Sequence, residues 1–122
     1  MNFISKRLQT LLAVTIFLAG CNTGSKELCN LPMQLNCPGA NLSFINLRGA
    51  DLAGANLEGA NLEGANLGGA SLADANLVNA DLTGADLSYT NLFEAIFKNA
   101  DLTDADLRGA FLNHADLTGA DL

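Results

Sequence analysis

Residues 50–69 read ADLAG ANLEG ANLEG ANLGG, four units of five residues in which Ala, then Asn or Asp, then Leu recur without interruption. The same register extends outward from this stretch over residues 40–122. The third place of the unit is Leu in 16 of 17 units, the first place is Ala in 15, and the second place is Asn or Asp in 14. Such a repeat decides the fold and is interpreted before any secondary structure.

A period of five fits neither an α-helix, with 3.6 residues per turn, nor a β-strand, with its alternation of two. A helix would spread the Leu residues around its circumference, and a flat strand would place successive Leu residues on opposite faces. A four-sided coil gathers them. Each unit then forms one side with its Leu and small Ala pointing inward, and Gly or a short polar residue at the fifth place suits the corner. Twenty residues close one coil, and the next stacks on it at about 4.8 Å.

The unit A-(D/N)-L-x-x resembles that of the pentapeptide-repeat family, and the resemblance covers residues 40–122. It implies an all-β fold, a right-handed quadrilateral β-helix, here of about four coils. Each coil packs its Leu residues against those of its neighbours, so stability is spread along the solenoid. We interpret the recurrent Asn and Asp of the second place as turn residues that hydrogen-bond the backbone.

The N-terminus has the pattern of a secretory signal. Lys6 and Arg7 precede a largely apolar run over residues 8–19, and small residues follow. The run is too short for an ordinary membrane span, which needs about 20 apolar residues. We therefore expect residues 1–20 to form a signal helix, with a plain transmembrane anchor as the weaker alternative.

The end of that run resembles the lipobox of bacterial lipoproteins, because it reads Leu18-Ala19-Gly20-Cys21. The resemblance implies cleavage before Cys21, acylation of its thiol and attachment to a membrane, with residues 21–27 as a short tether. Asn22, rather than Asp, after the cysteine favours the periplasmic face of the outer membrane if the cell is Gram-negative. An ordinary signal peptide, in which the cysteine has no such role, is the alternative.

Three cysteines leave one pair if Cys21 carries lipid. We predict a disulfide between Cys29 and Cys37, which would contribute roughly 2–3 kcal/mol on the chain-entropy estimate. Free thiols are the next alternative, and a zinc site lacks further ligands nearby in the sequence. Residues 28–39 would then form a cap, pinned by this disulfide, on the N-terminal end of the solenoid.

Residues twenty apart stack on one side of such a coil. Two columns of second places become acidic toward the C-terminus, namely Asn41, Asn61, Asp81, Asp101 and Asp121, and Asn46, Asn66, Asp86 and Asp106. We interpret these acidic ladders first as solvated turn residues. A negative surface for a cationic partner is the functional alternative, and Ca²⁺ is disfavoured because each site would offer few oxygen ligands.

Large apolar residues occupy outward places near the C-terminal end, and their cluster predicts a contact patch for a partner. The cluster comprises Tyr89, Phe93, Ile96 and Phe111. The alternative is that these are single apolar side chains of the kind found on any protein surface.

Charge and motifs narrow the class of function. With 6 Lys and Arg against 13 Asp and Glu, the formal charge is −7, which disfavours binding to nucleic acid phosphates. His114 is the only imidazole, and neither a nucleophilic triad, a phosphate-binding loop nor a cofactor or metal motif is found. We therefore predict a non-enzymatic, membrane-tethered envelope protein without a cofactor, which binds or spaces an unknown protein partner.

Two further expectations concern other partners. Some pentapeptide-repeat proteins resemble an acidic rod of B-form DNA and inhibit DNA gyrase, and this DNA mimicry is the alternative function. The export signal opposes it, because gyrase is cytoplasmic. The sequence stops inside a unit at residues 121–122, which leaves three alternatives: the uncapped C-terminal coil self-associates with another copy, the coil frays, or the chain is a truncated product.

Overall fold

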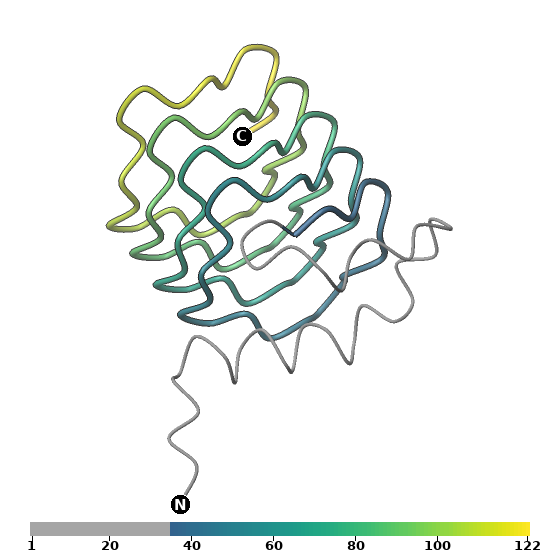
Figure 1. Ribbon diagram of the computed structural model, residues 1–122, viewed down its shortest axis with the longest axis horizontal. Coiled ribbons are helices and arrows are strands. Elements are labelled where there is room, and N and C mark those ends of the chain that lie inside the picture. Colours follow the sequence, from purple (N-terminus) through teal and green to yellow (C-terminus); the bar gives the residue numbers. More distant parts are fainter. Residues whose placement is uncertain (1–34) are drawn as a thin grey trace, which may run out of the picture.

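The computed structural model describes residues 35–122, which form a stack of four-sided coils from dark blue near residue 35 to yellow at residue 122 (Figure 1). The predicted signal helix and lipid-bearing tether lie outside the described residues, as does the greater part of the predicted cap. The described residues therefore cover the repeat region.

Isolated parallel bridges hold the coils together. Within residues 35–122 there is no continuous helix or strand, and each bridge joins the second place of one unit to the second place twenty residues further on, as between Asn61 and Asp81. The expected all-β solenoid is confirmed, with four units per coil. Its sides are single bridges rather than strands, because a corner interrupts the chain at every unit.

The bridges define four faces, which we name after the second places that they contain. Face A contains residues 41, 61, 81, 101 and 121, face B contains 46, 66, 86 and 106, face C contains 51, 71, 91 and 111, and face D contains 36, 56, 76, 96 and 116. The corner after each face is formed by the fifth place of the same unit.

The backbone of the unit at residues 60–64 shows how the coils are bonded. Its second-place N–H donates to the previous coil at 2.8 Å, and its third-place and fifth-place N–H groups donate to the next coil at 2.6 and 2.9 Å. The first-place N–H of the following unit closes the corner by donating to the third-place carbonyl at 3.0 Å. Only the fourth-place N–H has no backbone acceptor.

The side chain of the second place accepts this remaining donor. An Asn or Asp Oδ1 accepts the fourth-place N–H in thirteen of the sixteen units between residues 40 and 119, at 2.9–3.3 Å. In the preceding unit the fourth place is Pro38, which has no N–H to satisfy. The recurrent Asn and Asp residues thus complete the backbone hydrogen bonding, as the sequence indicated.

Every corner places its fifth residue in the left-handed region, with φ between 55° and 71°. A corner closed by a hydrogen bond, with positive φ at its third residue, is a type II β-turn. Gly fills nine of these seventeen positions and a side chain fills the other eight. An L-residue in this region is strained by roughly 1–2 kcal/mol, least for Asn and Asp.

The interior is a column of Leu and Ala side chains from every coil. The central Leu residues are fully buried, and two departures from the repeat are accommodated among them. Phe97 replaces a Leu and is itself fully buried. Thr90 replaces an Ala, and its hydroxyl donates to the carbonyl of Leu67 at 2.9 Å, so no buried side-chain polar atom in the described part of the chain lacks a partner.

The solenoid includes at least one unit before residue 40, where the repeat count of the sequence starts. Residues 35–39 form a complete unit, in which Asn36 bridges Asn56 and Cys37 occupies the buried place of Leu. The described part of the predicted cap is therefore itself a solenoid unit. Cys37 is not a free thiol in the structure, and its predicted disulfide partner, Cys29, lies outside the described residues.

The last coil is less enclosed than the others. Leu107, Leu112 and Leu117 are only partly buried, and Leu122 is 71% exposed. Self-association at this coil stays a prediction. Among residues 35–122, no helix has the length and apolar character needed to cross a membrane.

Candidate interaction surface

The outer places of the solenoid follow a code, and departures from it are concentrated in one region. The second place holds Asn or Asp, and the fifth holds Gly, Asn or Asp, with seven exceptions between residues 40 and 122. Two of these exceptions are Phe44 and Ser71. The other five lie within residues 89–114, and they are Tyr89, Glu94, Ile96, Phe111 and His114.

These departures weaken local structure. Ile96 and Phe111 have no side-chain acceptor for the fourth-place N–H of their units, which the Asn or Asp of regular units provides. Tyr89, Glu94 and His114 occupy left-handed corners where Gly is unstrained. Positions that break a local rule without a structural gain are those where a functional role is expected.

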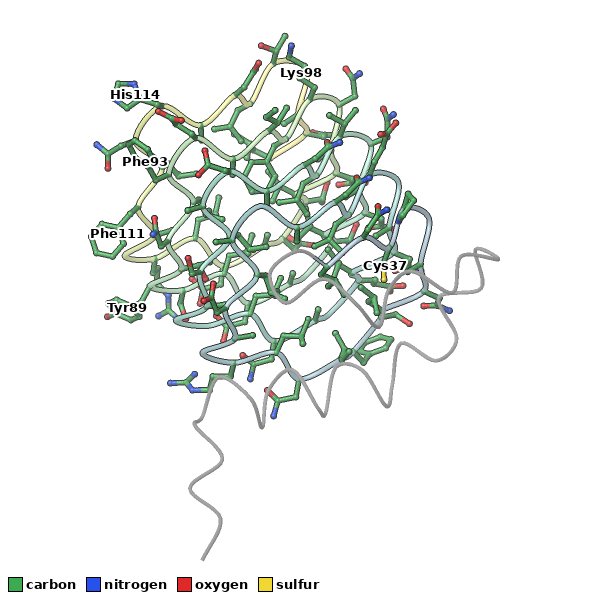
Figure 2. All side chains as sticks on the ribbon, viewed as in Figure 1. Cys37, Tyr89, Phe93, Lys98, Phe111 and His114 are labelled. Atoms are coloured by element: carbon green, nitrogen blue, oxygen red, sulfur yellow. The ribbon has the colours of Figure 1, made fainter. Side chains whose placement is uncertain are left out.

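Three of the four predicted patch residues lie together along face C and the corner that precedes it. Figure 2 shows Tyr89, Phe111 and Phe93 along one edge of the solenoid, followed by His114. Tyr89 is 71% exposed, Phe111 57% and Phe93 40%. We call these three aromatic residues and His114 the aromatic row.

Tyr89 covers the glycine one coil further on. A Cβ added at Gly109 would lie 2.6 Å from the tyrosine ring, so the ring lies directly over the bare backbone of that corner. Phe44 makes the same contact with Gly64 at the corner between faces A and B, in the N-terminal half. An aromatic ring at a corner therefore covers a glycine of the next coil at two places. One is Tyr89, inside the aromatic row, and the other is Phe44, outside it.

The other end of the row is held by an aromatic pair. The rings of Phe93 and His114 lie 5.6 Å apart at 84°, an edge-to-face contact between successive coils. The sequence interpretation did not include His114 in the patch. A usable signal existed, because an imidazole at a left-handed corner departs from the code of the fifth place.

Ile96, the fourth predicted patch residue, lies on face D, beyond the corner that ends face C. It is 37% exposed and bridges Asp116 of the next coil. On the same face, Lys98 forms an ion pair with Asp116 at 3.3 Å. Ile96 therefore extends the apolar region around the corner rather than belonging to the aromatic row.

The acidic ladder of face A is assembled as predicted. Asp81, Asp101 and Asp121 are joined by consecutive bridges. Face A carries no Lys or Arg at any outward place between residues 40 and 122, whereas Glu63 and the corner residue Asp104 add to its negative charge. Asp81 and Asp101, which both lie in complete units, each accept the fourth-place N–H of their own unit.

The second ladder, on face B, differs because its charge is compensated. Arg108 donates to both carboxylate oxygens of Asp106, with Nε at 2.9 and 3.0 Å. Arg48 and Asp86 face each other over Gly68, where an added Cβ would meet the guanidinium at 3.1 Å and the carboxylate at 3.2 Å. Face B carries two Arg and two Asp, so its formal charge is balanced. Of the two predicted acidic ladders, only that of face A forms a surface with uncompensated negative charge.

Hydrogen bonds, rather than mutual repulsion, govern the carboxylates with shifted pKa values. Arg108 lowers the pKa of Asp106 to about 2, chiefly through its side-chain hydrogen bond. Hydrogen bonds from Ser88 lower the pKa of Asp86, and hydrogen bonds from Thr103 lower that of Asp101. These carboxylates are consequently ionised at neutral pH.

The described region contains no grouping of three or more His, Cys, Asp or Glu side chains that could hold a metal ion. The geometry offers instead an exposed aromatic row, an anionic face A and a charge-compensated face B. All three are exposed surfaces of the solenoid and are available for contact with another molecule.

Comparison with known proteins defines the class of this scaffold. The family described as pentapeptide repeats (8 copies) matches residues 35–64, 60–99 and 95–122. The chain belongs to the pentapeptide-repeat family, as its five-residue unit indicated. The match includes residues 35–39, which form a solenoid unit in the structure. Among curated proteins no match was found.

Two solved structures of pentapeptide repeat proteins are similar to this chain to different degrees. A pentapeptide repeat protein from the thylakoid lumen of Arabidopsis thaliana is 33% identical, with a TM-score of 0.69 over 72% of this chain and 64% of that protein. HetL from Nostoc sp. strain PCC 7120, a protein involved in heterocyst differentiation regulation, is 39% identical over 70% of this chain and 50% of its own, with a TM-score of 0.42. This chain thus spans less than two thirds of the length of either protein.

QnrB1, a plasmid-mediated fluoroquinolone resistance protein, is 18% identical with a TM-score of 0.51, over 72% of this chain and 58% of that protein. At this level of identity the similarity concerns the fold alone. Members of one fold family carry different functions, so the role of this chain has to be argued from its own surface.

Proposed function

We propose that this protein is a non-enzymatic, membrane-tethered pentapeptide-repeat lipoprotein of the cell envelope, whose solenoid presents a docking face to a protein partner. The observation that carries the proposal is the concentration of five outer departures within residues 89–114. The interior of the same region stays closed, because its two departures from the repeat, Thr90 and Phe97, are both fully buried. Most departures in this region are on the outer layer, where selection for binding would act.

The physical argument rests on exposed aromatic area. Aromatic side chains are enriched at the centres of protein interfaces, because they bury a large area at a small cost in conformational entropy. Here they project from a backbone whose corners and bridges are hydrogen-bonded in every enclosed coil. A partner would therefore meet a preformed surface and lose little affinity to ordering it.

The tether part of the proposal is supported by the sequence. A basic segment, an apolar run and the lipobox-like residues 18–21 precede the solenoid in the order that export and acylation require. Several acyl chains on Cys21 would hold the protein stably, since each buried CH₂ contributes about 0.8 kcal/mol. We place the anchored protein on the periplasmic face of the outer membrane if the host is Gram-negative.

Site-specific photo-cross-linking in host cells tests the docking face. A photoreactive amino acid at position 113, an exposed fourth place of face C, should yield a discrete adduct with a partner protein. The same group at position 103, the fourth place of face A in the same coil, is the matched control. An adduct from face A alone, or from neither face, contradicts the proposal.

Intact-mass spectrometry of the protein extracted from host membranes tests the tether separately. Cleavage before Cys21 together with the mass of acyl chains is the expected result, and both should be lost in a Cys21→Ala variant. A full-length, unmodified mass in the soluble fraction contradicts the tether.

DNA mimicry is the second candidate function, and the uncompensated ladder of face A is the observation that favours it. A DNA-like surface needs negative charge on more than one side, and the Arg residues of face B reduce it there. Inhibition of DNA supercoiling by purified gyrase, relieved by Asp101→Asn, would support this candidate. Unchanged supercoiling at excess protein would remove it.

A further inference from the structure

We propose that the aromatic row binds a cationic segment of the partner protein, with Arg or Lys side chains laid over the aromatic rings. The inference rests on the proposed docking function and specifies the chemistry of the partner. Cations are attracted to the faces of aromatic rings by the ring quadrupole, and such contacts contribute about 0.5–1 kcal/mol each at exposed sites.

The distribution of charge around the row selects this partner. Asp74 and Glu94 stack in the corner column that borders face C, directly before His114. Both carboxylates are exposed, and neither forms an ion pair within residues 35–122. The row is therefore bordered by negative charge that the molecule itself leaves uncompensated.

The cations between residues 35 and 122 form no ion pair with Asp74 or Glu94, although the charge of Arg108 interacts with Tyr89 at one end of the row. Lys98 pairs with Asp116 on face D, and Arg108 pairs with Asp106 on face B. Arg48 lies on face B over Gly68, in the N-terminal half. Between residues 35 and 122 no other Lys or Arg occurs, against twelve Asp and Glu. Positive charge to pair with Asp74 and Glu94 would therefore come from another molecule.

The same distribution disfavours other classes of partner. An anionic lipid surface and a nucleic acid would both be repelled by the excess of carboxylates. A neutral glycan could stack on the aromatic rings, but it would gain nothing from Asp74 and Glu94. Charge complementarity thus points to a basic protein segment, and the glycan becomes an outcome of the test.

The test uses the full-length chain in detergent and a fluorescein-labelled nona-arginine peptide, with binding followed by fluorescence anisotropy. The test variant returns three positions to residue types that the repeat itself uses there, as Tyr89→Gly, Phe93→Thr and Phe111→Asn. Because these residues are compatible with the coil, the variant is expected to keep its fold, and circular dichroism verifies this.

Phe44→Gly is the matched control. It also removes a corner aromatic from above a glycine, but at the corner between faces A and B in the N-terminal half. Asp101→Asn is the control for general attraction to the acidic face. Glu94→Gln tests the bordering charge.

We expect the triple variant to bind the peptide at least about tenfold more weakly, as the loss of three cation–π contacts implies. The Phe44→Gly and Asp101→Asn variants should stay within about twofold of the wild type, while Glu94→Gln should bind about two- to fourfold more weakly. Affinity should also fall as salt rises from about 50 to 500 mM, because the bordering charges become screened.

Equal binding by the wild type and the triple variant would overturn the inference, as would a larger loss in Asp101→Asn. Binding of a neutral chito-oligosaccharide that disappears in the triple variant, without peptide binding, would overturn it in favour of a glycan. A partner cross-linked from position 113 through a segment without Arg or Lys would keep the docking function and overturn only its cationic chemistry. Absence of any cross-linked partner removes the docking function itself.

Discussion

Residues 50–69 and residues 89–114 share one interior and differ in their outer layer. In the first stretch every second place is Asn or Asp, every corner is Gly, and every fourth-place N–H is bonded by a side chain. In the second stretch five outer places depart from this code. Leu62 in the first stretch and Phe97 in the second are nevertheless both fully buried, whereas Leu107 and Leu112 of the last coil are only partly buried.

The difference shows that core packing and turn geometry depend on different places of the five-residue unit. The first and third places specify packing, and departures there, such as Thr90 and Phe97, are compensated inside the molecule. The second and fifth places specify turn geometry, and departures there change the chemistry of the outer surface, as Phe111 and Glu94 show. The following predictions break or sharpen this comparison, beginning with the largest effect.

Removal of the central side chain should destabilise both regions strongly. Phe97→Ala is expected to lower the free energy of unfolding by about 3–5 kcal/mol, and Leu62→Ala by about 2–5 kcal/mol, because each leaves a cavity in a closed core. Urea unfolding followed by circular dichroism measures both. A much smaller loss for Phe97→Ala would show that the C-terminal region does not share the interior of the regular one.

A methyl group at a corner should distinguish a covered glycine from an open one. Gly84→Ala meets no neighbouring atom and should lose only the roughly 1–2 kcal/mol of its left-handed conformation. Gly109→Ala also collides with the exposed ring of Tyr89, and displacing that ring from its rotamer should add about 0.5–1.5 kcal/mol.

The double-mutant cycle isolates the ring contact. In a Tyr89→Gly background, the two Ala substitutions should become equally destabilising in the same urea experiment. A difference that persists in that background would show that Tyr89 does not cover Gly109 in solution.

Restoration of the turn residue should stabilise the irregular region. Phe111→Asn supplies an acceptor for the N–H of Asn113 and is expected to add about 0.5–1.5 kcal/mol to the free energy of unfolding. Asn61→Ala, in the regular region, should lose a similar amount. Denaturant midpoints measure both, and a destabilised Phe111→Asn variant would mean that Phe111 is a packing residue.

Acidification should weaken the fold gradually. The folded pKa values of Asp101 and Asp106 lie below the ordinary 3.8, the latter at about 2, so their ionised forms favour the folded state. This stabilisation is present above about pH 4 and is lost as the pH falls through the folded pKa values. The thermal midpoint should therefore decline between pH 5 and pH 2.

An Asp106→Asn variant is the control for that titration. It should lose less of its thermal midpoint over the same pH range, because the amide oxygen still accepts the N–H of Arg108 without titrating. A midpoint that rises on acidification would show that repulsion between stacked carboxylates outweighs their hydrogen bonds.

Much of the candidate surface could be read from the sequence, because register alone assigns each residue to a face. Tyr89, Phe93 and Phe111 were identified in this way, as was the ladder of Asp81, Asp101 and Asp121. The unit at residues 35–39 was missed, although its Asn in the second place and Gly in the fifth fit the register. Counting from the first Ala hid this unit, since Leu and Cys replace the usual interior residues.

What the sequence determined by itself was the period, and with it the family, the direction of every side chain and the division into four faces. The reason is that the five-residue spacing is local and recurs along the whole repeat. Neither a helix nor a flat strand would gather the Leu residues on one side, whereas a four-sided coil does. What only the tertiary structure decided was how residues one or two coils apart meet. Arg48 reaches toward Asp86 because Gly68 has no side chain, and face B thereby loses its negative character. Contacts of this kind depend on side-chain conformation across coils, which periodicity does not encode.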